Sequence, residues 1–451
     1  MELDMTKGKP LGLLLKFMIP LIIGNIFQQL YNMVDTIIVG RFVGVEALAA
    51  VGATGTIMFL IIGFMQGITT GFTVLTAQRF GAGDVNGLKT SVGNAWVLSA
   101  IITVIMTFVS VLGMDFLLTV MNTPADIYDM AKEYIVIICK GMALNILYNL
   151  TSSFLRAVGN SKVPLYSLVA SAVVNIVLDL LFVVVIPMGV AGVAIATVIA
   201  QGVGGVICLV YMIKKVPIMH VGREHFVLDH HCVSNQLGVG VPMALQFSIT
   251  AVGTILVQAA LNLFGSVAVA AYTAAIKVES IVTQFYGALG MTMATYSAQN
   301  MGVNDIGRIR KGVRISNYLS AGYSVVVYGV IILLLPFMIR LFVGEGTPEL
   351  LGYARTYIYI CGACLAPLGM IFIYRNALQG CGYAMLPMLG GVVELVCRCV
   401  AAFAAVKLSS YAGVCLANAS AWVVTGIYLW IAYAFTMRKI LARRSQQTLK
   451  E

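Results

Sequence analysis

Four oxygen-bearing side chains inside long apolar runs have the types and spacing to hold a cation or a proton. Asp179 follows Asn175 by four residues, so the two side chains stack on one helical face and could chelate one cation or share one proton. Asp35 lies in the first apolar run, and Thr197 in a later run could supply a further oxygen. These hard oxygen donors suit sodium or a proton held between carboxylates, and the absence of imidazole and thiol argues against a transition metal.

Asp35 belongs to a polar stripe in which Asn25, Gln28 and Asn32 recur at intervals of three and four residues. A carboxylate near the middle of a bilayer is costly unless it faces a cavity or a partner, so this stripe should face water or protein rather than lipid. Two alternatives stay open. Either aspartate could be solvated at a helix end, and the Thr197 hydroxyl could bond back to a helix carbonyl.

The composition places these side chains in a membrane protein. Of the 451 residues, 60% are hydrophobic and only 10% are charged, and the mean hydropathy is +0.95, so a soluble chain would lack the charge to cover its surface. Many uncharged runs approach the roughly 20 residues of a spanning helix. We therefore expect an all-α integral membrane protein with about twelve transmembrane helices. Their expected ranges are 14–39, 49–77, 91–113, 131–155, 164–187, 190–213, 239–261, 268–297, 314–341, 353–377, 386–407 and 411–436.

The basic residues indicate how these helices are oriented. Alternate connections carry most of the lysines and arginines, among them Arg79, Lys214 and Arg308, whereas the opposite connections keep few, such as Arg41 and Lys132. By the positive-inside rule, the richer side and both termini are cytoplasmic, and the chain crosses the plasma (inner) membrane many times. This topology also accounts for the net charge of +10, so we expect a lipid bilayer and no nucleic acid as partner.

The sequence repeats itself internally. Thr76-Ala-Gln-Arg-Phe-Gly-Ala-Gly-Asp84 reappears as Ser297-Ala-Gln-Asn-Met-Gly-Val-Asn-Asp305, an offset of 297 − 76 = 221. Two further matches share this offset, Gly44 with Gly265 and Gly192 with Gly413, whereas Gly159 and Pro164 match Gly382 and Pro387 at 223. Six spans per copy give the halves the same orientation, which is the architecture of parallel-repeat transporters with a central cavity between two lobes.

The repeat predicts three parts: an N-terminal lobe over 1–213, a cytoplasmic linker over 214–236, and a C-terminal lobe with a cytoplasmic tail over 237–451. All four histidines lie in the linker, where a solvated connection is the default and a metal site the alternative.

The second lobe has a different set of polar residues inside its spans. Its first span carries Gln246 and other neutral groups, whereas Lys277 with Glu279 and Glu394 with Arg398 are expected to form internal ion pairs. Glu394 and Arg398 are four residues apart and would satisfy each other. We therefore place ion coupling in the N-terminal lobe.

At these residues the sequence closely resembles the multidrug and toxic compound extrusion (MATE) family over nearly the whole chain. The resemblance rests on four segments taken in order: Val34-Asp35-Thr36-Ile-Ile-Val-Gly40-Arg41, Gln78-Arg-Phe-Gly81-Ala-Gly with its copy Gln299-Asn-Met-Gly302, Leu155-Arg156-Ala-Val-Gly159-Asn, and Leu378-Gln379-Gly380-Cys-Gly382. In this comparison Asp35, Asn175, Asp179 and Thr197 match the N-lobe cation site of the DinF-like branch. The stretches 242–250 and 366–378 lack the acidic residues of the norfloxacin-exporter branch.

The resemblance implies a secondary antiporter that exports cationic or amphipathic compounds while protons or sodium enter, with no other cofactor and as a monomer. Gln28, Tyr31 and Asn32 would line the substrate cavity, and Pro20 would permit a hinge in the first span or pack without motion. We hypothesise that protonation of Asp35 or Asp179 loosens the contacts among the first, fifth and sixth spans and lowers affinity for the exported compound.

Three other functions compete with this one. A lipid-linked oligosaccharide flippase of related architecture would need a basic cavity for pyrophosphate, and Lys140 and Lys277 are the only obvious candidates. A membrane-embedded enzyme would need a nucleophile or metal constellation within the spans, but every histidine lies in one loop. A channel gives no reason for a duplicated lobe with carboxylates in one half.

Overall fold

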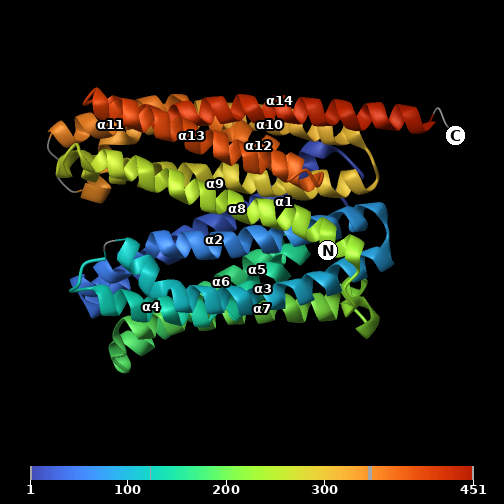
Figure 1. The fold of residues 1–451 in the computed structure, drawn as a ribbon, viewed down its shortest axis with the longest axis horizontal. Helices are drawn as coiled ribbons and strands as arrows, with labels where there is room; N and C mark the ends of the chain where they lie inside the picture. Colours follow the sequence, from blue (N-terminus) through green and yellow to red (C-terminus); the bar gives the residue numbers. More distant parts are fainter. Residues whose placement is uncertain (1–2, 122, 344–347, 449–451) are drawn as a thin grey trace. The chain divides into compact units, whose positions relative to one another are not determined.

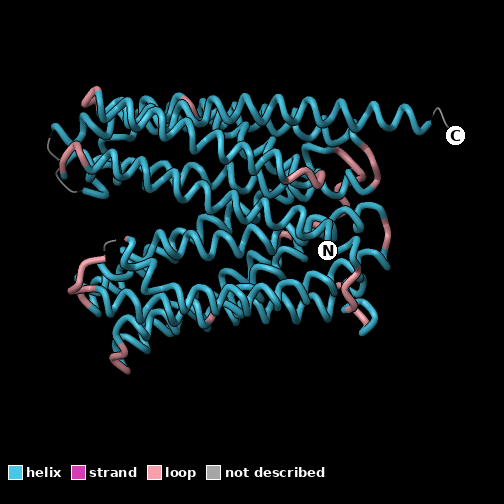
Figure 2. Tube along the Cα trace, in the orientation of Figure 1, coloured by secondary structure: helices cyan, strands magenta, loops and turns pink. Residues whose placement is uncertain are grey.

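The computed structural model describes residues 3–121, 123–343 and 348–448, and these form helices joined by short loops (Figures 1 and 2). Helical backbone satisfies its own N–H and C=O groups, which lipid cannot do. The helices of the first half are α1 Pro10–Ile38, α2 Val45–Ala82, α3 Val85–Val120, α4 Tyr128–Lys140, α5 Met142–Ala157, α6 Lys162–Leu180 and α7 Gly189–Lys215. Those of the second half are α8 His230–Asn262, α9 Ser266–Gly302, α10 Ile306–Val343, α11 Pro348–Ala363, α12 Leu365–Gly380, α13 Met385–Lys407 and α14 Tyr411–Thr448. Two short π-helices, η1 Val39–Val43 and η2 Leu181–Val185, extend α1 and α6, and two 3-10 helices, η3 Pro217–Met219 and η4 Arg223–Phe226, follow α7.

The expected membrane spans are confirmed. Among the described residues, ten helices are long and apolar enough to cross a membrane, and two bent pairs, α4 with α5 and α11 with α12, bring the number to twelve if each pair is one span. Each expected range matches one helix or one bent pair in the order along the chain. The fold class predicted from composition is therefore correct.

Two spans, each expected as one helix at 131–155 and 353–377, are bent. The axis turns by 50° between α4 and α5 and by 48° between α11 and α12. At the first bend, a Cβ on Gly141 would lie 2.4 Å from both methyl carbons of Val198, so only glycine allows α7 to approach there. At the second bend, Cys364 interrupts the helix three residues before Pro367, whose ring clashes with a preceding carbonyl in a continuous helix.

The internal repeat is visible in the loops as well as in the helices. Gly44 and Gly265, 221 residues apart (265 − 44), have φ of 130° and 87° and precede α2 and α9. Asp84 and Asp305 cap the helices that follow them. Each carboxyl group accepts a 2.9 Å hydrogen bond from the backbone N–H of the residue three positions later. Equivalent positions thus turn the chain in the same way in both halves.

The chain forms two compact units. The first unit contains Met1–Lys7 and Leu15–Ala244, and the second contains Gly8–Leu14 and Leu245–Glu451. The segment 214–236, expected as the linker between lobes, therefore groups with the first unit. The Asn94 side chain of α3 holds part of it, donating to the carbonyls of His225 (3.2 Å) and Val227 (3.0 Å) and accepting from the Asp229 N–H (2.9 Å).

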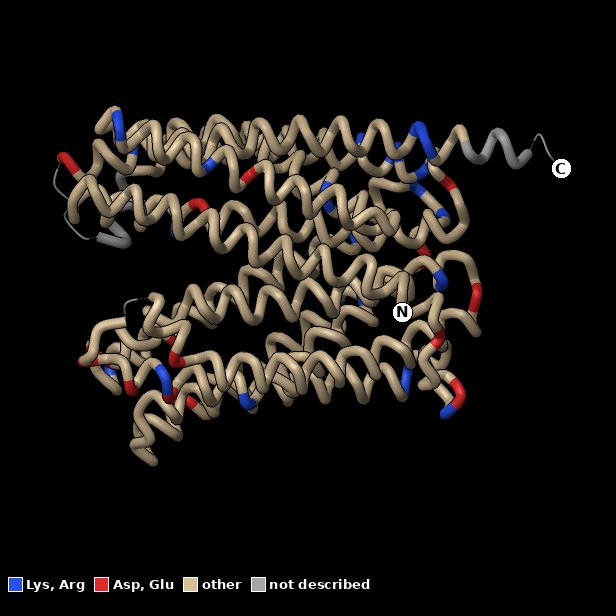
Figure 3. Tube along the Cα trace, in the orientation of Figure 1, with Lys and Arg blue, Asp and Glu red and all other residues tan. Residues whose placement is uncertain are grey.

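Most charged residues lie in loops and near helix ends, and few lie along the middle of the helices (Figure 3). Burying an isolated charge is unfavourable, so the few charges within spans are expected to have partners or a function. The next sections concern those residues. Among the described residues, which include the four linker histidines, no group of three His, Cys, Asp or Glu side chains could hold a metal ion.

Candidate functional site

The structure brings the predicted carboxylates together. Asp35 lies in the last turns of α1 and Asp179 near the end of α6, and their carboxyl groups interact directly. At Gly24, α1 lies close to α6, since a Cβ there would make ordinary contacts of 3.6 Å with Leu165 and Leu168. Two residues that are remote in sequence therefore form one acidic pair inside the first unit.

The remaining predicted ligands, Asn175 and Thr197, are also buried. Asn175 lies one turn before Asp179 on α6, and both side chains have 0% exposure, while Thr197 of α7 has 6%. Oδ1 of Asp35, both carboxyl oxygens of Asp179, the amide of Asn175 and the hydroxyl oxygen of Thr197 are buried and lack a hydrogen-bond partner among the described residues.

Such an arrangement has a clear chemical consequence. Two carboxylates that face each other are both acceptors, so they repel unless one carries a proton or a cation lies between them. Buried polar atoms without partners cost free energy. The described part of the chain places no lysine or arginine in an ion pair with Asp35 or Asp179. The donor set of carboxylate, amide and hydroxyl oxygens fits a proton or a sodium ion.

Two tyrosines complete the surroundings of the pair. Tyr31, one turn before Asp35 on α1, lies beside Thr197 and interacts electrostatically with both aspartates. Tyr134 of α4 also interacts with Asp35, Asp179 and Tyr31, and it is 3% exposed. Tyr31 was predicted from the sequence to line the substrate cavity, whereas Tyr134 was not predicted to have a role. The internal repeat could have marked Tyr134 as a candidate. Tyr134 matches Tyr357 at an offset of 223 (357 − 134), the same offset that relates Gly159 to Gly382.

Both aspartates lie immediately before a π-helical segment. Asp35 precedes η1 by four residues and Asp179 precedes η2 by two, and η1 and η2 contact each other. π-helical turns are rare and occur often at functional sites. Each irregular turn thus begins within four residues of an acidic residue.

The other predicted residues of α1 lie elsewhere on the same helix. Gln28 and Asn32 are exposed, whereas Pro20 is buried within α1, which continues as one helix from Pro10 to Ile38. Their roles in a substrate path and a hinge remain predictions.

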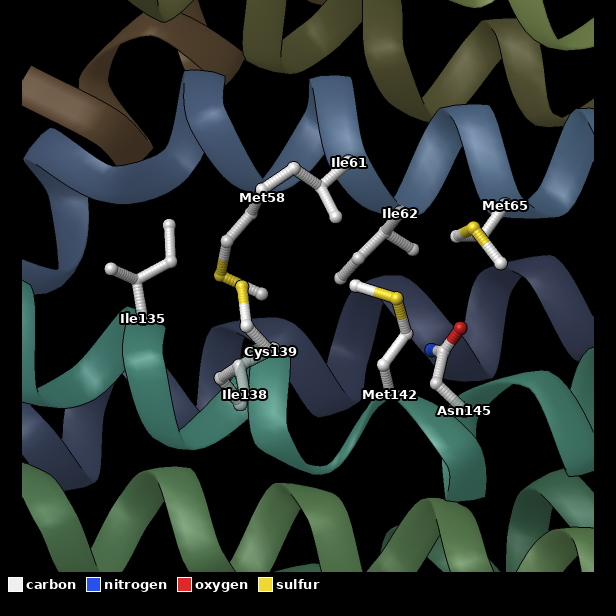
Figure 4. A pocket seen from close by; sticks show the side chains of 9 residues that line it. All are labelled: Met58, Ile61, Ile62, Met65, Ile135, Ile138, Cys139, Met142 and Asn145. Atoms are coloured by element: carbon white, nitrogen blue, oxygen red, sulfur yellow. The ribbon is translucent and has the colours of Figure 1, made fainter. Parts of the chain in front are cut away.

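A small apolar pocket lies between α2, α4 and α5. Met58 and Met65 of α2 face Cys139 of α4 and Met142 of α5 across it, and the amide of Asn145 lies at one end (Figure 4). The cavity measures about 10 Å³, the space of about one water molecule. Flexible thioether side chains can repack around guests of different shapes.

Of the two ion pairs predicted from the sequence in the second unit, the structure contains one, Glu394 with Arg398, and not the other, Lys277 with Glu279. Arg398 and Glu394 of α13 pair at 2.7 Å, and Arg375 of α12 reaches the same carboxylate at 3.4 Å. Lys277 and Glu279 do not pair, because side chains two residues apart point to different sides of a helix. Instead, the Tyr357 hydroxyl of α11 donates a hydrogen bond to Glu279 Oε2.

Comparison with known proteins gives a consistent result. The MatE family model matches residues 20–181 and 242–404. The chain is 31% identical over 323 residues to the probable multidrug resistance protein YoeA of Bacillus subtilis (strain 168), covering 69% of each chain. It is 26% identical over 392 residues to the probable multidrug resistance protein YpnP of the same organism, covering 86% of each.

Among solved structures, an outward-facing multidrug resistance MATE family transporter of the MOP superfamily superposes with a TM-score of 0.91 at 21% identity, covering 97% of this chain and 98% of that one. This likeness shows the same fold. The resemblance noted in the sequence is thereby confirmed at the level of the family. Because these relatives and neighbours are transporters, the prediction that the chain is not an enzyme is also correct. The chain belongs to the MATE (MatE) family of multi-pass membrane transporters.

Proposed function

We propose that this protein is a multidrug efflux antiporter of the plasma membrane, with both termini in the cytoplasm, which exports cationic or amphipathic small molecules in exchange for H⁺ or Na⁺. The carrying observation is the pair formed by the half-buried Asp35 and the buried Asp179, which the described residues leave without a basic partner. The names of the relatives, which are called multidrug resistance proteins, support the class of substrate.

The acidic pair supplies the coupling. With a proton or sodium bound, Asp35 of α1 and Asp179 of α6 attract the same ion and hold the two helices together. Without it, two like charges in a poorly solvated site repel each other. Ion binding and release therefore change the packing of α1 against α6, and Pro20 gives α1 a position at which its second half can move.

The substrate meets a surface of matching chemistry. An acidic site favours cationic molecules, and the exposed amides of Gln28 and Asn32 precede it along α1. Met58, Met65 and Met142 line a cavity of about 10 Å³, so contact with a ring system requires their flexible thioether side chains to repack around it. Substrate and coupling ion thus compete for the same negative charge.

Transport in reconstituted vesicles tests this proposal. The full chain is placed in liposomes, ethidium serves as the substrate, and a proton gradient or a sodium gradient is imposed alone. Asp35→Asn and Asp179→Asn should each reduce gradient-driven ethidium movement to the level of protein-free vesicles, because an amide cannot take up the proton and holds sodium poorly.

Asp115→Asn is the matched control. Asp115 lies on α3 and is 61% exposed in its ion pair with Lys132, so its loss should leave transport unchanged. Full activity of both Asp35→Asn and Asp179→Asn would contradict the proposal. The gradient that drives the wild-type protein identifies the coupling ion.

A further inference from the structure

The helices α3 and α10 occupy equivalent places in the repeat, but their first turns have different surroundings. In the first unit, the polypeptide that follows α7 covers the start of α3. A Cβ on Gly93 would lie 2.2 Å from the carbonyl oxygen of His225, and the Asn94 amide donates hydrogen bonds to the carbonyls of His225 and Val227. The chain's own backbone therefore occupies this side of α3.

The equivalent side of α10 has neither of these features. Gly93 corresponds to Arg314 and Asn94 to Ile315 at the offset of 221 (314 − 93 and 315 − 94), so both the close approach and the amide are lost. The counterpart of α7 is α14, which continues as a helix instead of folding back. Lys311 and Arg314 of α10 are accordingly exposed.

This exposed surface begins a face of α10 that has the character of a lipid-facing helix. Lys311, Arg314 and Tyr318 follow one another at intervals of three and four residues, and Val325 and Leu333 continue the same face. Tyr318 is 72% exposed, Val325 74% and Leu333 80%. Exposed aliphatic side chains on a spanning helix face lipid, and a tyrosine at the edge of the apolar stretch lies at the level of the headgroups. Lys311 and Arg314 therefore lie at the level of the lipid phosphates.

The end of α14 lies on the same side of the membrane as the start of α10. Counting each bent pair as one span, α10, α11 with α12, α13 and α14 make four crossings, which return the chain to the side where α10 begins. Lysines and arginines gather near this end of α14 (Figure 3). Arg438 and Lys439 are exposed there, and Arg310 of α10 interacts electrostatically with Tyr433 of α14.

The positive charge at this end of the second unit lacks compensation within the described residues. Of the carboxyl groups described in this unit, only that of Asp305 lies at this end, and it accepts a hydrogen bond from the Arg308 backbone N–H at 2.9 Å. The exposed cations without an ion pair in the described part of the chain are Arg310, Lys311, Arg314, Arg438 and Lys439. An anionic partner is therefore expected.

The neighbouring apolar surface decides which anion fits. A guanidinium can bind phosphate oxygens in a bidentate manner, and an ammonium adds a point charge. A free phosphate would leave the apolar face below Tyr318 without a partner, whereas a phospholipid covers both parts. We propose that this face of α10 binds an anionic phospholipid, with its phosphate at Lys311 and Arg314 and an acyl chain along Val325 and Leu333. Because the inference concerns lipid binding and not transport, it holds or fails independently of the proposed antiport.

Native mass spectrometry of the purified full-length protein in detergent tests this proposal. Phosphatidylglycerol and phosphatidylcholine with identical acyl chains are titrated separately, and the wild-type protein should bind phosphatidylglycerol more tightly. Lys311→Gln/Arg314→Gln should weaken phosphatidylglycerol binding roughly 25-fold, about fivefold for each cation lost, and leave phosphatidylcholine binding unchanged. Both side chains are exposed and glutamine is a good helix former, so the variant should fold. Equal affinity of the wild type for both lipids, or an unchanged preference in the variant, would overturn the proposal.

Two controls separate this face from general charge and from a soluble ligand. Lys214→Gln/Lys215→Gln also removes two exposed cations, at the end of α7, and should leave phosphatidylglycerol binding unchanged. Equal weakening by both double variants would show that overall charge, and not this face, attracts the lipid. Excess glycerol 3-phosphate carries the headgroup chemistry without acyl chains and should not displace phosphatidylglycerol. Displacement would show that a soluble phosphate compound binds and contradict the assignment to a lipid.

Discussion

The two units place polar side chains at the same positions of the repeat but fill them with opposite chemistry. Around Asp35 and Asp179 the partners are tyrosines, an amide and a hydroxyl, and several buried oxygens lack donors among the described residues. Around Glu279 and Glu394 two guanidiniums supply the missing charge. The comparison shows that the two copies share the location of a buried polar site, whereas single differences such as Asn175 against Arg398 (398 − 175 = 223) decide whether its carboxylates meet a buried positive charge.

The largest difference in the free energy of unfolding should appear when the equivalent side chains Arg398 and Asn175 are each replaced by leucine. Arg398→Leu leaves Glu394 with one distant guanidinium and should lower the free energy of unfolding by about 3–5 kcal/mol, as for a broken buried ion pair. Asn175→Leu removes an amide without a described partner and should cost about 1 kcal/mol or less. Thermal unfolding of both variants in detergent measures the contrast.

The double variant Glu394→Gln/Arg398→Leu is the control for this pair of variants. Removing both charges should recover part of the stability lost in Arg398→Leu. Equal losses in Arg398→Leu and Asn175→Leu would show that the two sites do not differ in charge compensation.

A smaller effect should distinguish the two bends, which the units reach by different means. Gly141→Ala places a Cβ 2.4 Å from the methyl groups of the stiff Val198 side chain and should cost about 1–3 kcal/mol. Cys364→Ala occupies the equivalent position (364 − 141 = 223), where Pro367 already breaks the helix, and should change stability by less than about 0.5 kcal/mol. Thermal unfolding in detergent measures the stability of both variants. If Gly141→Ala does not change stability, α7 can move away from the added Cβ.

The smallest expected effect concerns the loops that the repeat shares. Gly83 has φ of 71° and its partner Asn304 has φ of 57°, so both adopt the left-handed conformation. Gly83→Ala should cost about 1 kcal/mol, because a Cβ is disfavoured there. Asn304→Gly should be neutral within a few tenths of a kcal/mol. Chemical denaturation of the two variants side by side provides the measurement, and a costly Asn304→Gly would point to a role of the amide itself.

Much of the fold and part of the site could be predicted from the sequence, for physical reasons. Length and the scarcity of charge fix the spans, and a carboxylate in an apolar run stands out because burial is costly, which is why Asp35 and Asp179 were found. Tyr134 and the hydrogen bond from Tyr357 to Glu279 depend on other helices, so no local pattern marks them. The failed pairing of Lys277 with Glu279 was predictable from helical geometry alone.

The π-helical turns η1 and η2 make the acidic pair adjustable without unfolding. A π turn holds one residue more than an α turn, and if it reverts to α geometry, everything on one side of it rotates by about 100° relative to the other. For α1 and α6, such a change of a few backbone hydrogen bonds would carry Asp35 or Asp179 away from its partner. The one extra residue in each π turn therefore allows α1 or α6 to turn its carboxyl group toward the partner carboxyl group or away from it.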